Sequence, residues 1–217
     1  MIRKHISLGL VLAGTFLLIS VLAPIGISQL SFNLKPRLID PTLVASAPIP
    51  VISAVLGTTS TDYSQPTSWF PTASYTPTAS KVQYFTLSIP SLKMFDVPVE
   101  INGVDLKKNP IQFPGTAVPG TYGNTVIFGH SSLPQLYKPD NPLTIFNPTV
   151  KAKIGEEIFV NYDGVNYKYV VRNITEVRPE QIEVLAQRYD KHELTLITCV
   201  PLGTYLRRHV LRAELVN

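Results

Sequence analysis

The sequence predicts a mostly β domain, either a closed barrel or a sandwich, in the C-terminal part of the chain. From Lys81 onward, short runs of β-branched and aromatic residues alternate with turn residues, which is the pattern of many short strands. Helix-forming stretches are scarce in the same region. The chain has 217 residues, 45% of them hydrophobic and 16% charged, which is enough for one domain with a core.

The candidate strands share this texture and are bounded by Gly, Pro, Asn or Asp. They cover residues 82–89, 93–101, 125–128, 157–163, 167–177, 193–199 and 208–215. Asp163-Gly164 between two of them indicates a hairpin turn. Residues 109–124 are rich in Pro and Gly and are expected to form a long irregular loop. Residues 179–189 are compatible with a short amphipathic helix that has proline in its first turn, and 131–136 with one further helical turn.

An apolar segment near the N-terminus predicts a membrane-spanning helix. Residues 6–27 are long enough, at about 1.5 Å per residue, to cross a hydrocarbon core of roughly 30 Å. Arg3 and Lys4 precede the segment, so the positive-inside rule leaves the start in the cytoplasm and the rest outside the cell. A cleaved signal peptide is the alternative, but a proline follows each possible cleavage site. We therefore expect residues 1–34 to be an uncleaved anchor of a single-pass cell-membrane protein.

Residues 35–80 have the composition of an extracellular tether. Between residues 41 and 80 the only charged residue is Asp62, and Ser, Thr, Pro and Ala dominate. Prolines break helices and remove donors from sheets, so an extended segment is expected. Trp69-Phe70 is the exception: this pair either docks on the domain, where it can act as a lid, or forms a loosely packed surface pair. The β domain then covers residues 81–217.

Cys199 is the only cysteine of the chain and ends an apolar run. It has no partner for an intrachain disulfide, so its uses are packing or chemistry. An exported protein that keeps one unpaired thiol exposes it to oxidation, and a strand end next to a Pro/Gly loop suits the rim of a barrel. These features favour the interpretation of Cys199 as a nucleophile over its interpretation as a small buried packing residue.

His130 and an arginine pair are candidates for work with this thiol. His130 follows Gly129 at the end of another apolar run, and a Cys/His pair can act as thiolate and imidazolium. Arg207 and Arg208 open the last candidate strand, and a guanidinium can stabilise an oxyanion. Neighbours on a strand point to opposite faces, and alternation alone leaves open which of the two faces the thiol.

Several function classes are disfavoured. The formal charge is +4 and the pI is about 9.1, but the basic residues are scattered and form no nucleic-acid-binding motif. The sequence has neither a Gly-rich phosphate loop nor paired metal-ligand spacing. We therefore expect no cofactor, no metal and no nucleic-acid partner.

Three ordered motifs make residues 82–217 resemble the sortases, which are membrane-anchored cysteine transpeptidases of the cell envelope. Residues 195–199 read Thr-Leu-Ile-Thr-Cys, residues 123–130 resemble the strand of the family's catalytic histidine, and Arg208 fits the spacing of the family arginine better than Arg207. The resemblance implies an eight-stranded β-barrel as the catalytic domain. It also implies that a Leu-Pro-x-Thr-Gly-like signal is cleaved before the Gly through a thioacyl intermediate on Cys199.

The resemblance further assigns roles and partners. It implies that Cys199 is the nucleophile, His130 the general acid/base and Arg208 the oxyanion stabiliser. The implied substrate groove is lined by Thr198, Ile197 and Phe128. The implied partners are secreted proteins with a C-terminal sorting signal and an amine acceptor, either a cell-wall precursor peptide or a pilin lysine.

Other classes remain as alternatives. An L,D-transpeptidase should carry Ser-x-Gly-Cys, which is absent, and a papain-like amidase usually has its cysteine before its histidine. The non-enzyme alternative is a membrane-anchored β-barrel that binds cell-wall peptides, in which Cys199 is a packing residue.

Overall fold

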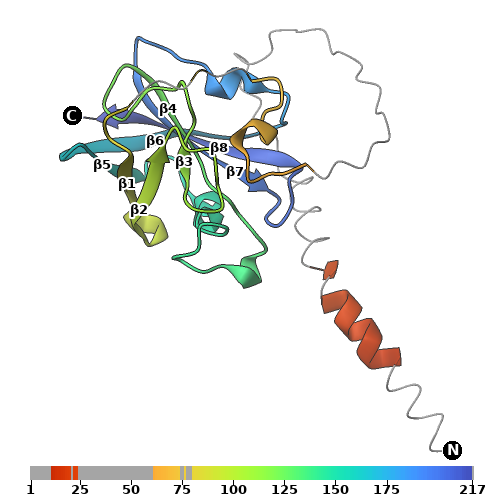
Figure 1. Cartoon of the computed structure of the whole chain (residues 1–217). Coiled ribbons are helices and arrows are strands. Elements are labelled where there is room, and N and C mark those ends of the chain that lie inside the picture. Colours follow the sequence, from red (N-terminus) through yellow and green to blue (C-terminus); the bar gives the residue numbers. More distant parts are fainter. Residues whose placement is uncertain (1–10, 21, 24–60, 74–75, 77–79, 217) are drawn as a thin grey trace, which may run out of the picture. The chain divides into compact units, whose positions relative to one another are not determined.

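A computed structural model of the chain describes residues 11–20, 22–23, 61–73, 76 and 80–216 (Figure 1). Residues 11–20 and 22–23, inside the expected anchor, are helical. Among the described residues, no helix has both the length and the apolar character that a membrane crossing requires. The remainder of the expected anchor and residues 35–60 of the expected tether lie outside the described residues. The membrane anchor therefore stays a prediction.

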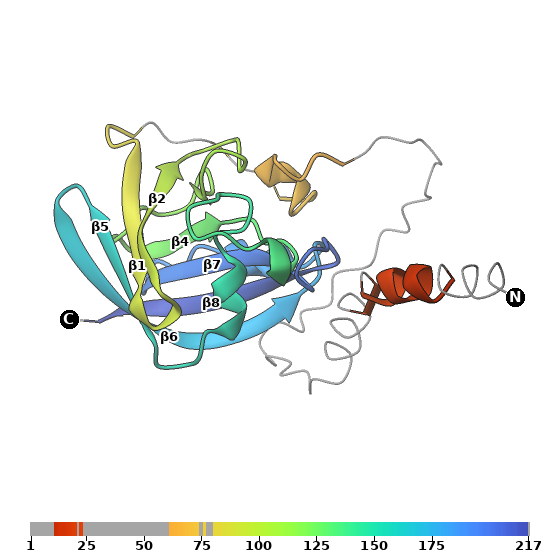
Figure 2. The same cartoon turned by 90° about the horizontal axis from the view of Figure 1, so that it is seen from below.

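The C-terminal region forms the closed eight-stranded barrel that the family resemblance implied, with strand order β1-β2-β3-β4-β7-β8-β6-β5 (Figures 1 and 2). The strands are β1 (Tyr84–Ile89), β2 (Met94–Ile101), β3 (Ile111–Gln112), β4 (Gly123–Phe128), β5 (Glu157–Tyr162), β6 (Val165–Val177), β7 (His192–Val200) and β8 (Arg207–Val216). The short 3-10 helices are η2 (Pro66–Ser68), η3 (Pro90–Leu92), η4 (Pro134–Leu136), η5 (Asn147–Lys151) and η6 (Ile182–Leu185). All seven strand runs found by periodicity are strands, while β3 lies in the stretch expected to be an irregular loop.

Three neighbouring strands build the wall that carries the site. β4 and β7 run parallel, with Phe128 opposite Ile197, and β7 and β8 run antiparallel, with Ile197 opposite Val210. Because side chains alternate along a strand, each of these strands presents one set of residues to the barrel interior and one to its outside. The wall therefore has two faces, and both are buried.

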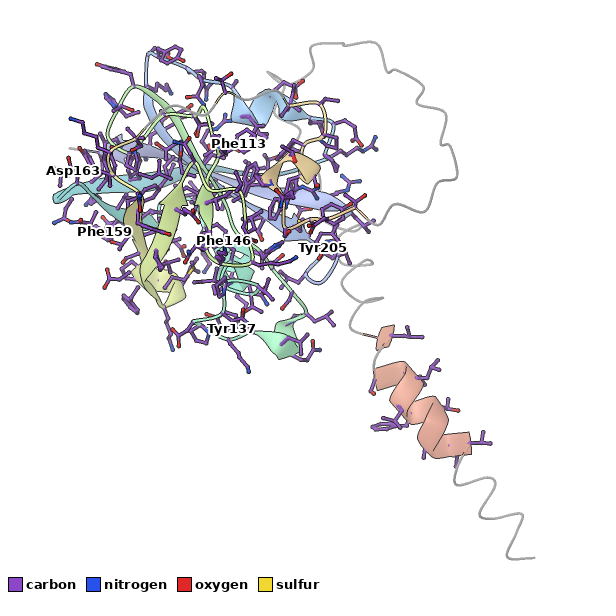
Figure 3. The ribbon with its side chains drawn as sticks, in the orientation of Figure 1. Phe113, Tyr137, Phe146, Phe159, Asp163 and Tyr205 are labelled. Carbon is purple, nitrogen blue, oxygen red and sulfur yellow. The ribbon has the colours of Figure 1, made fainter. Side chains whose placement is uncertain are left out.

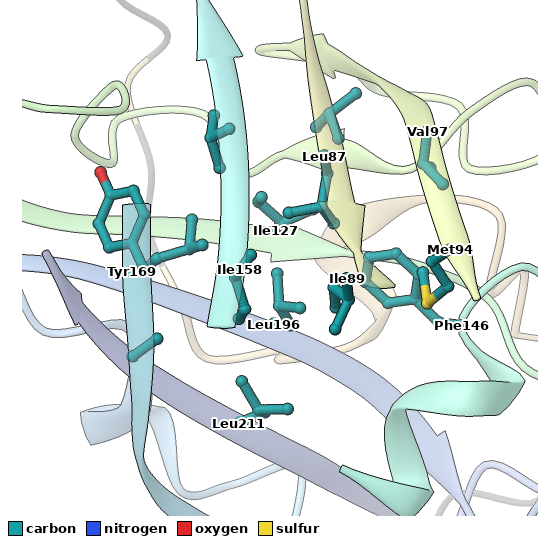
Figure 4. Close-up of a cluster of buried hydrophobic side chains, with 14 of the residues drawn as sticks. Leu87, Ile89, Met94, Val97, Ile127, Phe146, Ile158, Tyr169, Leu196 and Leu211 are labelled. Carbon is teal, nitrogen blue, oxygen red and sulfur yellow. The ribbon is translucent and has the colours of Figure 1, made fainter. Parts of the chain in front are cut away.

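The inner face belongs to the barrel core. Leu87, Ile127, Leu196 and Leu211 are at most 1% exposed and meet in the cluster shown in Figure 4. Burying one such side chain is worth about 1.5–3 kcal/mol, so this cluster stabilises the barrel.

The outer face of the same wall forms a second apolar cluster. Phe128, Ile197, Cys199 and Val210 belong to it, together with Trp69 from the segment before the barrel. We call residues 61–73 the cover segment; it is drawn in orange in Figure 1. Part of the stretch expected to be a tether is thus packed on the barrel wall.

The helix considered for residues 179–189 is reduced to the four residues of η6. The carbonyls of Val184 and Leu185 accept hydrogen bonds from the side chains of Asn124 and Gln187, respectively. These side-chain bonds and the 3-10 bond from the Ala186 N–H to the Glu183 carbonyl satisfy the backbone there in place of an i to i+4 ladder.

Candidate active site

Strand register places the predicted arginine beside the thiol. Cys199 and Arg208 are directly opposed Cα partners on β7 and β8, so their side chains lie on the same face of the sheet. Arg207 is opposed to Val200 and is partly exposed, whereas Arg208 is 0% exposed. The structure thus decides what sequence alternation left open: Arg208 is the neighbour of Cys199.

His130 follows the end of β4, next to the end of β7. The Thr198 hydroxyl donates to the Gly129 carbonyl at 2.7 Å, and the Ser131 hydroxyl donates to the Cys199 carbonyl at 2.7 Å. These two bonds bracket His130 and fix its backbone against the strand that carries the thiol. The three predicted residues therefore meet at one end of the β4-β7-β8 wall.

Gly129 has a steric reason to be glycine. A Cβ at this position would overlap the aromatic ring of Phe146, which is labelled in Figure 3. The backbone N–H of Phe146 in turn donates to the His130 carbonyl at 3.1 Å. The small residue thus lets Phe146 hold the histidine-bearing turn in place.

The predicted groove residues fall on two faces. Phe128 and Ile197 are fully buried in the outer cluster that contains Cys199. Thr198 alternates to the opposite face of β7, and its hydroxyl is used for the bond to Gly129. In this arrangement Thr198 supports the turn that carries His130. Contact of all three residues with a substrate stays a prediction.

The Arg208 guanidinium is a buried charge satisfied by carbonyls. Its Nε and Nη2 donate to the Trp69 carbonyl at 3.2 and 3.0 Å, and its Nη1 donates to the carbonyls of Tyr205 and Arg207 at 2.9 and 3.2 Å. The guanidinium carbon also lies 5.5 Å from the Trp69 ring centroid. The Arg208 guanidinium therefore already binds a backbone carbonyl of the cover segment.

Trp69 and Phe70 dock on the domain, and the alternative of a loosely packed surface pair is wrong. Both side chains are 0% exposed. The Trp69 ring stacks on Phe128 with centroids 5.2 Å apart and lies 5.5 Å from the His130 ring. This pair therefore covers the side of the wall on which the three predicted residues meet.

The cover segment is tied down at its start as well. Tyr63 stacks on Tyr205, labelled in Figure 3, with centroids 4.0 Å apart. The Trp69 indole N–H donates to the Tyr63 carbonyl at 2.8 Å, and the Leu106 N–H donates to the Ser64 carbonyl at 3.0 Å. Sequence reasoning missed Tyr205 and Leu106 as partners because they are far from the cover segment along the chain.

The covered site holds its titratable pair in uncharged forms. Burial raises the pKa of the Cys199 thiol to about 11, with the Arg208 charge acting in the opposite direction. Burial, together with the positive charge of Lys107, lowers the pKa of His130 to about 4, while Asp105 and Asp62 oppose this shift. At neutral pH the covered state therefore contains a thiol and a neutral imidazole.

Acid is expected to uncover the site. An exposed His130 takes up a proton near its ordinary pKa of 6.5, whereas the covered one does so only near 4. The uncovered form binds more protons in this window, so the covered form is fully favoured above pH 6.5 and loses stability as the pH falls towards 4.

Trp69 is the only tryptophan of the chain, so its fluorescence reports this transition directly. Its emission should shift to longer wavelength as the pH falls through the window, while circular dichroism of the barrel stays constant. The same titration of His130→Asn, which has no imidazole to protonate, should be flat; an equal shift in that variant would assign the effect to another group.

Comparisons with known proteins agree with this fold. A family model described as a sortase domain matches residues 87–216, and the chain belongs to the sortase family. It is similar to sortase A from Bacillus anthracis, with 32% identity over 96 residues, which are 44% of this chain and 41% of that protein. It is also 35% identical over 72 residues to sortase A from Streptococcus agalactiae serotype III (strain NEM316), covering 33% and 28% of the two chains. The chain therefore spans less than half the length of these curated relatives.

Among solved structures, a lid mutant of sortase A from Corynebacterium diphtheriae superposes with a TM-score of 0.55 at 30% identity. The match covers 64% of this chain and 73% of that one.

Proposed function

We propose that the protein is a cysteine transpeptidase that cleaves a Leu-Pro-x-Thr-Gly-like sorting signal and transfers the acyl part to an amine of the cell envelope. The observation that carries the proposal is the pairing of Cys199 with Arg208 on adjacent strands, with His130 on the turn that follows the third strand of the same wall. A thiol, a guanidinium and an imidazole at one strand end are the groups that acyl transfer requires.

The chemistry proceeds in two balanced steps. The Cys199 thiolate attacks the carbonyl carbon of the threonine, and Arg208 stabilises the negative charge that develops on its oxygen. The His130 imidazolium donates its proton to the leaving glycine nitrogen, so the C–N bond breaks and a thioester remains. An incoming amine then attacks the thioester carbon, His130 accepts the amine proton, and the C–S bond breaks to return the thiolate.

The cover segment acts as a lid in this proposal. A substrate carbonyl that uses Arg208 has to replace the Trp69 carbonyl, and a charged Cys/His pair requires the return of solvent. A lid is a named feature of the similar sortase A from Corynebacterium diphtheriae.

Location and partners follow from the same proposal. We place the enzyme at the cell membrane, held by the apolar segment within residues 1–34, with the catalytic domain outside the cell. Its protein substrates are secreted and carry the sorting signal at their C-terminus. The acceptor is the amine of a cell-wall precursor peptide or of a pilin lysine, and water as acceptor gives simple thiol-peptidase hydrolysis.

The test is incubation of the protein with a library of sorting peptides and a panel of amines, followed by intact mass spectrometry. An acyl adduct that maps to Cys199 and is released by amine supports the transpeptidase. The burial of Cys199 favours one rival, a barrel that binds wall peptides and uses the thiol for packing. Peptide binding without any adduct, also after removal of the cover, would favour that rival.

Trp69→Ala is expected to speed the reaction of Cys199 with iodoacetamide at neutral pH by about tenfold or more. Loss of the Trp69 ring removes part of the cover, so water reaches the thiol, its pKa falls from about 11 towards its ordinary value of 9.0 and the thiolate fraction increases. The rate is measured by mass spectrometry under native conditions. The control is Phe95→Ala, which removes a ring that is 63% exposed and should leave the rate unchanged. Equal rates in Trp69→Ala and the parent protein would mean that Trp69 does not limit access.

A further inference from the structure

The side-chain amide of Gln187 joins two segments that are distant in sequence. Its Oε1 accepts from the N–H groups of Ala117 and Asn124 at 3.2 and 3.0 Å. Its Nε2 donates to the carbonyls of Asn124 and Leu185 at 3.0 and 3.1 Å. Two acceptor sites and two donors are all that a primary amide offers, so this amide is fully used on backbone groups.

Asn124 makes the reciprocal connection from β4. Its side chain is 0% exposed, and its Nδ2 donates to the carbonyl of Val184 in η6 at 3.2 Å. Its Oδ1 accepts from the Thr195 hydroxyl of β7 at 2.7 Å. We call Gln187 and Asn124 together the amide clasp. It ties η6 to the same β4-β7 pair that carries His130 and Cys199.

What the clasp holds is an apolar surface next to the thiol. Val184 is 2% exposed and belongs to the cluster that contains Cys199, Trp69 and Phe70, and Leu185 packs against that cluster. In Figure 1 the blue turn η6 and the orange cover segment lie next to each other. Loss of the cover segment would remove Trp69 and Phe70 from this cluster, and Val184 would belong to the apolar surface that is left.

We propose that the amide clasp holds η6 as a preformed wall of the substrate groove, so that Gln187 and Asn124 are positioning residues for peptide binding. The inference rests on the proposed transpeptidase function. The four-residue η6 has only a short 3-10 hydrogen-bond pattern, with the Ala186 N–H donating to the Glu183 carbonyl, to keep its shape. A wall that is not fixed has to be ordered each time a substrate binds. A wall that is already fixed avoids this entropic cost, so the peptide binds with higher affinity.

The clasp makes its bonds to backbone groups and to the Thr195 hydroxyl, and not to the side chains of Cys199, His130 or Arg208. Its loss should therefore weaken peptide binding while leaving the chemical step nearly intact. This split separates a positioning role from a catalytic one.

The experiment compares Gln187→Ala and Gln187→Met with the parent full-length chain. The methionine variant keeps the length of the side chain and loses all four bonds, so it separates hydrogen bonding from volume. The matched control is Gln181→Ala, because the Gln181 Oε1 accepts from the nearby Arg178 N–H at 2.9 Å and is not part of the clasp. Hydrogen exchange of residues 181–187 and the kcat and KM of acylation by a Leu-Pro-x-Thr-Gly peptide are measured for each.

Both Gln187 variants should exchange faster across residues 181–187 and raise KM about tenfold, with kcat changed by about twofold or less. Gln181→Ala should match the parent in both. The positioning role would be overturned if the Gln187 variants kept the hydrogen-exchange rates of the parent protein or had the same KM as Gln181→Ala. It would also be overturned if they lost activity only through a lower kcat. If the parent protein forms no acyl-enzyme with any peptide, the transpeptidase proposal fails, and hydrogen exchange alone decides whether the clasp fixes η6.

Discussion

Cys199→Ala is expected to abolish both cleavage of a sorting peptide and transfer to an amine while the barrel stays folded. Without the thiol the covalent route does not exist, and no other cysteine is present in the chain to replace it. The side chain is 1% exposed, so losing its sulfur costs packing of about 1 kcal/mol or somewhat more, which a barrel of this size tolerates. Product formation is followed by chromatography and the fold by circular dichroism.

The control for this loss is Val99→Ala. Val99 is 0% exposed in the inner cluster of the barrel, so the variant loses comparable packing without touching the site. It should keep most of the activity at a temperature where it is folded. Acyl transfer by purified Cys199→Ala would disprove the proposed mechanism, because no thioester forms without sulfur.

Arg208→Ala is expected to slow acylation of Cys199 by about a hundredfold or more, since removal of one oxyanion donor typically costs roughly 3 kcal/mol. Arg208→Lys should recover little of this loss, because a point charge does not reproduce the planar fork of a guanidinium. Arg207→Ala should lose only a few-fold, since Arg207 is opposed to Val200 and not to the thiol. Single-turnover acylation by a sorting peptide is measured in all three variants.

A second signal distinguishes the two arginines. Arg208 donates to the Trp69 carbonyl, and Arg207 points to the opposite face of β8, so we expect Arg208→Ala to release the cover and shift Trp69 emission to longer wavelength more than Arg207→Ala does. Slow acylation in Arg207→Ala beside a near-normal Arg208→Ala would show that the charge next to Cys199 does not stabilise the oxyanion.

Periodicity and turn chemistry predicted the strands well, with one informative omission. β4 and β7 were found from apolar runs, because such runs suit strands buried on both faces. β3 has only two residues and pairs with β2 and β4 inside a Pro/Gly-rich stretch. No periodic pattern exists over two residues, so the eighth strand was predictable only through the family resemblance.

The packing of the cover segment could not be predicted from the sequence. Its composition is that of a tether, and only Trp69-Phe70 departed from it. The contacts that turn this pair into a cover include the Arg208 bond to Trp69, which spans 139 residues of sequence. Such a contact exists only after the barrel has closed, and for that reason the sequence left a lid and a surface pair equally open.

The sequence by itself determined the strand runs, the family and the identity of the reactive groups, because periodicity and motifs are carried by neighbouring residues. Tertiary structure decided that Arg208 faces Cys199, since strand register is fixed by closure of the barrel. It also decided that the thiol and the imidazole are uncharged at neutral pH, because burial, which exists only in the folded chain, shifts their pKa values.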